Sequence, residues 1–283
     1  MCNVIHSFYS HKCSEFEAFM QSCYFILSAI YANDTGLPIT LYSDYEFGQC
    51  VQKAPYKKIN GIFNDHENYA KIDPIVWAWP KFLSLDMCPR DTVHIDGDVF
   101  LKSGFKKSNI EYNGCDVICQ HLELWEHTQC FQTAWTETFN SIKHFDFPED
   151  IVKDIPKAMF NNGVLGVNND QLWKRYKECY WHMVEQSIPG SIHPEGWCVP
   201  DIIFEQYFLT QLCKDKYKVK YVLTGNTSED ICNDATNKRY QHVCADKKRD
   251  LKICLAMIKL KNKFCFDSIK TIWSDKFPEY FEI

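Results

Sequence analysis

The hydrophobic positions of the first hundred residues follow two alternating patterns. Short apolar runs recur, and between them lies a longer stretch in which apolar side chains return every three or four positions. Short runs are typical of buried strands, and the longer spacing is typical of an amphipathic helix. We therefore expect strand and helix to alternate, with strands over residues 4–9, 39–42, 57–62 and 92–95.

Two helices in this half have recognisable ends. Ser14 and Glu17 have the spacing of a capping box, and Gly36-Leu37-Pro38 ends the helix that they begin. Asp73-Pro74 puts a proline at a first helical position. This predicts a second helix, which runs through Lys81 to about Cys88.

The second half continues the alternation less regularly. We expect strands over 116–120, 159–167 and 219–223, and helices over 170–186, 200–213 and from Asp246 onward. The apolar face of the last helix is formed by Leu251, Cys254, Leu255 and Ile258. Repeated strand-helix-strand units imply a mostly parallel sheet flanked by helices. The sequence therefore predicts one α/β domain over residues 1–283.

The charge of the chain limits the kinds of partner. A net charge of −6, from 31 basic and 37 acidic residues, argues against a nucleic-acid binder, which usually carries a basic excess. Between Lys238 and Lys270, however, ten basic and three acidic residues give a local excess of +7. This segment favours an anionic ligand such as a diphosphate or a lipid headgroup, and peripheral membrane contact through the basic C-terminal helix stays open. An ordinary solvated helix face is the alternative.

Cysteine usage and the N-terminus bear on the compartment. The fifteen cysteines lie mostly in apolar stretches and form no Cys-x-x-Cys pair, which favours reduced core cysteines over a disulfide framework. Residues 1–10 lack the basic and apolar regions of a signal peptide. No stretch approaches the roughly 18 apolar residues of a membrane span. We expect a cytoplasmic protein.

The sharpest motif is Asp96-Gly97-Asp98, which follows the apolar run over 93–95. On an extended backbone, alternation puts both carboxylates on one side of the chain. Such oxygen ligands suit Mg²⁺ or Mn²⁺, and Gly97 lets the backbone turn and a ligand approach closely. A plain Asp-Gly turn is the alternative. Ligands of parallel sheets bind where strands end, and both this motif and Asp44 follow a strand, which favours a ligand site.

Further candidate residues follow later in the chain. His242 can complete a metal site with a neutral imidazole, and Lys247 and Lys248 at the start of a helix can contact a diphosphate. Asp201 and Glu205 lie four residues apart on one helix face. Such carboxylates can orient or deprotonate a sugar hydroxyl, and an exposed helix edge is an equal alternative.

Amide and aromatic side chains supply weaker signals. Asn161 and Asn162 before Gly163 can hydrogen-bond to sugar hydroxyls, or they can mark a turn or bulge. Tryptophans can provide stacking platforms for sugars, although core packing accounts better for most of them. The candidates for stacking are Trp77, Trp79, Trp125 and Trp197.

The order of these motifs resembles the GT-A glycosyltransferases. It runs from a strand with Asp-x-Asp, through a strand with Asn-Asn-Gly and a helix with Glu205-Gln206, to a late histidine with basic residues. More narrowly, the segment 94–100 (HIDGDVF) is similar to a group of uncharacterised bacterial proteins related to that fold. The resemblance implies the nucleotide-diphosphosugar transferase fold. It also implies metal ligation by Asp96, Asp98 and His242.

The same resemblance implies contacts to a nucleotide-sugar donor. Diphosphate contact falls to Lys248 and a basic donor contact to Lys81, while Asn162 and Glu205 would contact the acceptor or donor sugar. Lys247 and Asp44 complete the predicted donor contacts. Residues 1–100 would form the nucleotide-binding half, and residues 101–283 the acceptor-binding half. The glycine usual after the late histidine is absent, since Cys244-Ala245 stands there instead.

The expected activity is metal-dependent glycosyl transfer of the hexosyltransferase type. A nucleotide-diphosphosugar, with a UDP-sugar as the expected donor, would give its sugar to a saccharide or another hydroxyl acceptor in the presence of Mn²⁺ or Mg²⁺. Glu205 or Asp201 would position the acceptor, or act as the base. One rival is a phosphohydrolase in which a strand-end aspartate is the nucleophile. Another is a non-catalytic protein that only binds a nucleotide sugar.

Overall fold

The computed structural model describes residues 3–11, 13–127, 129–192, 198–223, 240–242 and 247–283, and of residues 66, 127, 129–131, 240–242 and 247–249 only the backbone. Contacts within the chain form two compact units. The first unit comprises Met1–Cys2, Asp65–Val93 and Ile110–Cys232. The second unit comprises Asn3–Asn64, His94–Asn109 and Asn233–Ile283.

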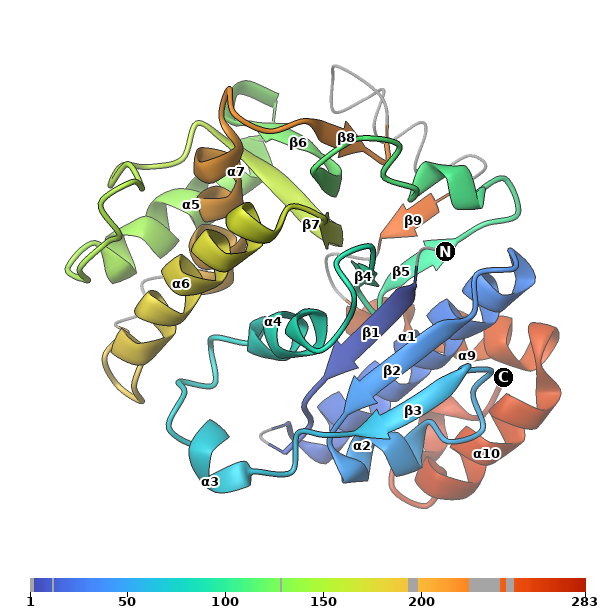
Figure 1. Ribbon diagram of the computed structural model, residues 1–283. Coiled ribbons are helices and arrows are strands. Elements are labelled where there is room, and N and C mark those ends of the chain that lie inside the picture. Colours follow the sequence, from blue (N-terminus) through green and yellow to red (C-terminus); the bar gives the residue numbers. More distant parts are fainter. Residues whose placement is uncertain (1–2, 12, 128, 193–197, 224–239, 243–246) are drawn as a thin grey trace. The chain divides into compact units, whose positions relative to one another are not determined.

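The second unit begins with parallel strands that alternate with helices (Figure 1). Its strands lie in the order β3-β2-β1-β4, and β2 pairs in parallel with both β1 and β3. The strands are β1 (Val4–Phe8), β2 (Ile39–Ser43), β3 (Lys58–Gly61) and β4 (Val93–Ile95). Two helices, α1 (Glu15–Asp34) and α2 (Tyr45–Cys50), connect β1 to β2 and β2 to β3. The predicted strand-helix alternation is confirmed.

Helix α1 has the predicted start but a more buried interior than one apolar face implies. The Glu17 amide donates to Ser14 Oγ and the Ser14 amide donates to Glu17, so the capping box is present. Every residue over 22–30 is buried. Helices α9 (Lys247–Lys261) and α10 (Lys263–Trp273) pack against α1 within this unit. The predicted apolar face of α9 is buried there as well.

Helix α10 is absent from the predicted elements. Its N-cap is Asn262, whose side chain accepts a hydrogen bond from the Cys265 amide at 3.1 Å. Because Asn262 interrupts the lysine-rich stretch without a glycine or proline, the sequence alone does not mark the break between α9 and α10.

The first unit holds strands of both directions. β6 (Val117–Leu124) pairs antiparallel with β7 (Ala158–Val167) and parallel with β8 (Val219–Tyr221). Its helices include α4 (Trp79–Asp86), α5 (Gln129–Ile142) and α6 (Asp170–Gln186). The Phe82 ring of α4 stacks on Tyr180 of α6, with 3.6 Å between the ring centroids. The α/β class, with mostly parallel strands flanked by helices, is thus confirmed.

Two helices of the structure differ in detail from the prediction. The helix expected from Asp73-Pro74 is wrong at its start, because a turn at 74–75 and three irregular residues precede α4, which begins only at Trp79. The Asp73 side chain and carbonyl accept hydrogen bonds from Ile75 and Val76, which closes a turn instead. The helix expected over 200–213 exists, but it contains a π-helical segment at Ile202–Tyr207 before α7 (Phe208–Cys213).

The remaining elements are short. β5 (Val99–Leu101) pairs antiparallel with β9 (Tyr240–His242) in the second unit, and α3 spans His66–Tyr69. Short 3₁₀ helices occupy Lys107–Asn109, Trp125–His127 and Pro278–Tyr280. Within the described part of the chain, no helix has the length and apolar character to cross a membrane. The cysteines whose side chains are described are free thiols, and burial raises the pKa of Cys23 and of Cys119.

Candidate functional site

The acidic motif forms a tight turn directly after β4. The Val99 amide donates to the Asp96 carbonyl at 3.0 Å, so residues 96–99 close a β-turn. The prediction that alternation along an extended backbone aligns the two carboxylates is therefore wrong. Asp98 is buried, and the Asp96 side chain keeps 19% of its surface exposed.

Gly97 is required by packing rather than by its backbone angle. Among the described glycines, the positive φ angles belong to Gly36, Gly114 and Gly190, not to Gly97. A Cβ atom on Gly97 would lie 2.0 Å from the Phe25 ring of α1. The turn thus packs directly against α1, which fixes the position of the backbone that carries the two carboxylates.

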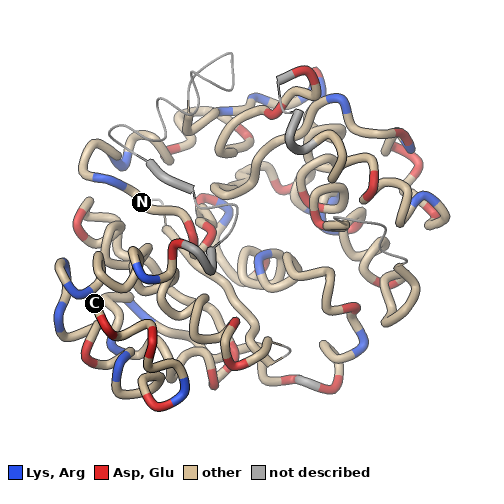
Figure 2. The backbone as a smooth tube through the Cα atoms, turned by 180° about the vertical axis from the view of Figure 1, so that it is seen from behind, with Lys and Arg blue, Asp and Glu red and all other residues tan. Residues whose placement is uncertain are grey.

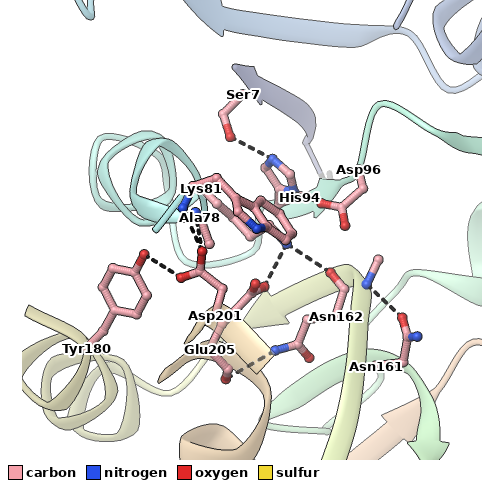
Figure 3. Close-up of polar contacts among 12 residues, drawn as sticks. Ser7, Ala78, Lys81, His94, Asp96, Asn161, Asn162, Tyr180, Asp201 and Glu205 are labelled. Carbon is pink, nitrogen blue, oxygen red and sulfur yellow. Dashed lines mark hydrogen bonds and ion pairs between the residues drawn. The ribbon is translucent and has the colours of Figure 1, made fainter. Parts of the chain in front are cut away.

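His94 lies behind the turn and contacts its first carboxylate (Figure 3). Its Nε2 lies 2.8 Å from Ser7 Oγ on β1, and its Nδ1 lies 3.5 Å from Asp96 Oδ1. His94 is almost wholly buried. The sequence carried a signal for this contact, since His94 and Asp96 are two residues apart at a strand end and such residues share a face. Nevertheless, no role was predicted for His94 from the sequence.

A second buried histidine stabilises the residue after the turn. Ser28 Oγ of α1 donates to the Val99 carbonyl at 2.6 Å and lies 3.2 Å from His6 Nε2. Burial lowers the pKa of His6 to about 3, and the charge of Asp98 opposes that shift. His6 is therefore neutral at physiological pH and acts as a hydrogen-bonding core residue.

Strand pairing brings the late histidine to the acidic turn. Val99 of β5 pairs with His242 of β9, although these two residues are 143 positions apart in the sequence, so the backbone of His242 lies at the register position next to Asp98. The side chains of His242, Lys247 and Lys248 lie outside the described residues; the backbone of the two lysines begins α9.

The residues at this turn fit a divalent cation by their chemistry. Two carboxylates and an imidazole are a donor set for Mn²⁺ or Mg²⁺. Among the side chains that the structure describes, no three His, Cys, Asp or Glu residues are grouped as a metal site. The third predicted ligand, His242, lies outside that set, so metal ligation by Asp96, Asp98 and His242 stays a prediction.

Asp44 has a structural role at the end of β2. Its Oδ1 accepts hydrogen bonds from the Phe47 amide at 2.8 Å and from Ser10 Oγ at 2.9 Å, and its Oδ2 accepts from the Ser10 amide. Asp44 is fully buried and is the N-cap of α2. The predicted donor contact of Asp44 stays a prediction, since these bonds already account for its position.

In the first unit, three predicted site residues contact one another: two of them form a buried ion pair, and the third hydrogen-bonds to both (Figure 3). Lys81 Nζ lies 2.6 Å from Glu205 Oε1 and donates to the Asn162 carbonyl at 3.1 Å. Asn162 Nδ2 in turn donates to the Glu205 carbonyl at 3.3 Å. The Asn162 Oδ1 atom is buried and has no hydrogen-bond partner among the described residues. It is an open acceptor beside a charged pair.

The π-helical segment is what presents Glu205 to this cluster. The Phe208 amide bonds to the Ile203 carbonyl, five residues back, and the Glu205 carbonyl accepts hydrogen bonds from Asn162 and from the Tyr176 hydroxyl instead. Such π-bulges occur frequently at functional sites. The sequence predicted the helix but carried no signal for this local widening.

Asp201 holds the turn before α4. Its Oδ2 accepts from the Trp77 amide at 2.6 Å and the Ala78 amide at 3.0 Å, and its Oδ1 accepts from the Tyr180 hydroxyl at 3.0 Å. Complete burial raises the pKa of Asp201 to about 6, against the opposing effect of these donors and of Lys81. Asp201 therefore fixes the two residues directly before α4 from a distant segment. In a helix that began at Asp73-Pro74, these two amides would bond within the helix instead.

A second polar group lies where β6 and β7 pair. Asn161 Nδ2 donates to Glu123 Oε1 at 2.8 Å, and His121 Nε2 lies 3.5 Å from the same oxygen. Asn161 Oδ1 accepts from the Gly163 amide at 3.1 Å. Asn161 and Asn162 thus lie within β7, and the register shift of this pair falls on β6, between Cys119 and His121. Glu123 and His121 were absent from the predicted site.

Fold and site together define an α/β protein with an acidic turn after β4. The strand that follows this turn, β5, pairs with β9 from near the end of the chain. The chain belongs to a family of unknown function: the model described as "Family of unknown function (DUF6734)" matches residues 4–282. No curated protein matches the chain significantly.

Several solved structures are similar at low identity. A complex of the galactosyltransferase LgtC with donor and acceptor sugar analogues is 12% identical, with a TM-score of 0.46, and the match covers 90% of this chain and 96% of that one. A glycosyltransferase involved in glycosylation of the major capsid of PBCV-1 is also 12% identical (TM-score 0.43, 90% and 98% covered). Mouse xyloside xylosyltransferase 1 is 17% identical (TM-score 0.39, 76% and 82% covered).

Proposed function

We propose that the protein is a metal-dependent glycosyltransferase that takes a sugar from a nucleotide-diphosphosugar and transfers it to a hydroxyl acceptor. The observation that carries this proposal is the pairing of β5 with β9. It places His242 at the register position next to Asp98. The backbone of a histidine far along the sequence thus lies beside the acidic turn, which supports the proposal that its imidazole and the two carboxylates would form the donor set for a cation that binds a diphosphate.

The second unit supplies the residues for the diphosphate. Asp96, Asp98 and His242 would hold Mn²⁺ or Mg²⁺, whose charge stabilises the diphosphate leaving group. Lys247 and Lys248 at the start of α9 add positive charge, and the helix N-terminus favours an anion. His94 orients Asp96 through the 3.5 Å contact, because its other nitrogen is fixed by Ser7.

The first unit supplies candidate sugar contacts. Asn162 Oδ1, a buried acceptor without a partner among the described residues, is the proposed acceptor for a sugar hydroxyl, and Lys81 is held in place by Glu205. In this proposal Glu205 positions Lys81 rather than acting as a base, because its carboxylate is buried and paired. Asp201 positions Trp77 and Ala78. The expected donor is a UDP-sugar, and the acceptor is a saccharide or another hydroxyl compound.

The test combines ligand binding with turnover. Melting temperatures are measured with each nucleoside diphosphate and nucleotide sugar, with and without Mn²⁺, followed by assays for release of the free diphosphate. A ligand that binds the native state raises the melting temperature. We expect one diphosphate to stabilise the protein only with Mn²⁺, and Asp98→Asn to remove that effect. Asp275→Asn, an exposed carboxylate of the same unit, is the matched control.

Three results discriminate the alternatives. Mn²⁺-dependent binding with donor hydrolysis supports the transferase. Binding without hydrolysis of any donor, in the presence of a panel of acceptor sugars, favours a non-catalytic nucleotide-sugar-binding protein. Phosphate release from simple phosphoesters that depends on Asp96 favours a phosphohydrolase.

A further inference from the structure

The C-terminal helices carry an unusual outward face. Leu260 is 81% exposed, and Ile253 and Phe264 are each 64% exposed, which makes them the three most exposed large hydrophobic side chains described. Ile253 and Leu260 lie seven residues apart on α9, on one side of the helix, and Phe264 lies in the first turn of α10. All three belong to the second unit.

These exposed side chains lie outside the hydrophobic core of the second unit. The inward face of α9 is complete without them, because Leu251, Cys254, Leu255 and Ile258 are buried in the core that α1 shares with α9 and α10. Single exposed apolar residues are ordinary, but several on adjacent helix faces indicate an interaction surface.

Basic residues surround the apolar side chains. Lys252, Lys259, Lys261 and Lys263 lie on or just after α9 and are exposed, and Lys53 Nζ lies 5.8 Å from the centroid of the Phe264 ring. Residues 252–276 contain six Lys and two Asp, an excess of +4 in a chain whose net charge is −6. Figure 2 shows basic and acidic segments together near the C-terminus.

The acidic neighbours leave most of this positive charge in place. Lys261 pairs with Asp34 at 2.8 Å and Lys263 with Asp267 at 2.6 Å, both at exposed positions. Such exposed pairs contribute little and exchange readily for other anions. A surface with apolar side chains at its centre and lysines around them is complementary to an interface that is apolar inside and anionic outside.

We propose that the face of α9 and α10 formed by Ile253, Leu260 and Phe264, with the lysines around it, docks the protein on an anionic lipid surface. The apolar side chains enter the boundary between headgroups and acyl chains, while the lysines bind lipid phosphates. The proposal is independent of the proposed transferase activity, since none of these residues belongs to the candidate site.

Vesicle co-sedimentation tests the proposal directly. The full chain is mixed with vesicles of phosphatidylcholine alone, or of phosphatidylcholine with phosphatidylglycerol. We expect binding to the anionic vesicles only, weakening as salt concentration rises. Leu260→Asp should reduce the partition coefficient at least about 10-fold, and Lys252→Glu with Lys263→Glu should reduce it further. Val152→Asp, also an exposed apolar residue (58%) but in the first unit, should bind as the parent does.

Other outcomes overturn the proposal. Equal binding of the parent chain and Leu260→Asp to anionic vesicles would show that this face is not the contact. No vesicle binding together with a concentration-dependent dimer that Leu260→Asp dissolves, measured by analytical ultracentrifugation, would assign the face to a second copy of the chain. Melting temperatures of the variants verify that each is folded.

Discussion

The ammonium of Lys81 and the carboxylate of Glu205 form an ion pair with 2.6 Å between Nζ and Oε1, and both side chains are more than 95% buried. The pair joins α4 to the π-helical segment, two elements that are 124 residues apart at these positions. A buried pair of this kind is weak evidence for stability, but removing one partner leaves an uncompensated charge in the interior.

Lys81→Met is therefore expected to cost about 3–5 kcal/mol of unfolding free energy, measured by urea denaturation. Replacing both residues, in Lys81→Met with Glu205→Met, should recover a large part of that loss. The exposed pair Lys263–Asp267 has the same 2.6 Å separation and serves as the control, so that Lys263→Met should cost less than about 1 kcal/mol. Equal losses in the two single variants would contradict the argument from burial.

Asp201 makes stability depend on pH in a defined direction. Because burial raises its pKa to about 6, from 3.8, the folded state favours the protonated acid. The protonated acid therefore contributes to the free energy of unfolding below pH 4, and this contribution is lost as the pH rises through 6. The shift in pKa corresponds to about 3 kcal/mol. Asp201→Asn cannot titrate, so its unfolding free energy relative to the parent chain should improve by about that amount between pH 4 and pH 7.

Denaturation of both proteins at several pH values measures this difference. The comparison cancels carboxylates with the opposite behaviour, such as Asp86 and Asp150, whose pKa values are lowered by Lys177 with Trp173 and by Arg175, respectively. For Asp86, burial acts against that lowering. If the two stability curves run parallel from pH 4 to pH 7, Asp201 does not titrate in the folded protein as stated.

Gly97 should be irreplaceable because of Phe25. An alanine Cβ would overlap the buried Phe25 ring at 2.0 Å, so Gly97→Ala is expected to cost at least about 3 kcal/mol. Gly114→Ala is the control. The φ angle of Gly114, 82°, is unfavourable for alanine, but an added Cβ would have no non-neighbouring atom within 4 Å. We expect this substitution to lower the unfolding free energy by about 1–2 kcal/mol. Thermal or urea unfolding measures both.

A second-site change separates packing from backbone conformation at Gly97. Phe25→Leu removes part of the ring that the new Cβ would meet, so Gly97→Ala should cost less in that background. Additive losses from the two substitutions would show that the cost of Gly97→Ala arises elsewhere.

Asp44 is expected to affect stability without affecting ligand binding. Asp44→Ala removes the N-cap of α2 and leaves the Ser10 amide without its acceptor, a loss of about 2–3 kcal/mol. Because Asp44 is fully buried and its oxygens are engaged, the affinity for a nucleoside diphosphate should stay unchanged. Isothermal titration of the folded variant decides this, and a weakened affinity would instead support the donor contact predicted for Asp44 from the sequence.

The sequence by itself determined the local features of this protein. Periodicity located β2 and α6, since each buries its apolar positions at the spacing its geometry requires, and it located β1, β3 and α1 to within a few residues. The capping box of Ser14 and Glu17 and the strand before Asp96 could be predicted because they depend on a few neighbouring residues. The motif order also selected Lys81, Asn162 and Glu205, which the structure brings together.

Only the tertiary structure decided features that depend on distant segments. Helix α4 begins at Trp79 rather than at Pro74 because Asp201, far along the chain, accepts the Trp77 and Ala78 amides. Gly97 is needed because Phe25 of α1 lies against it, and the backbone of His242 lies opposite Val99, the residue after Asp98, because β9 pairs with β5. Local propensity contains no term for a contact between segments far apart in the sequence, so burial and hydrogen bonding in the folded chain settled these positions.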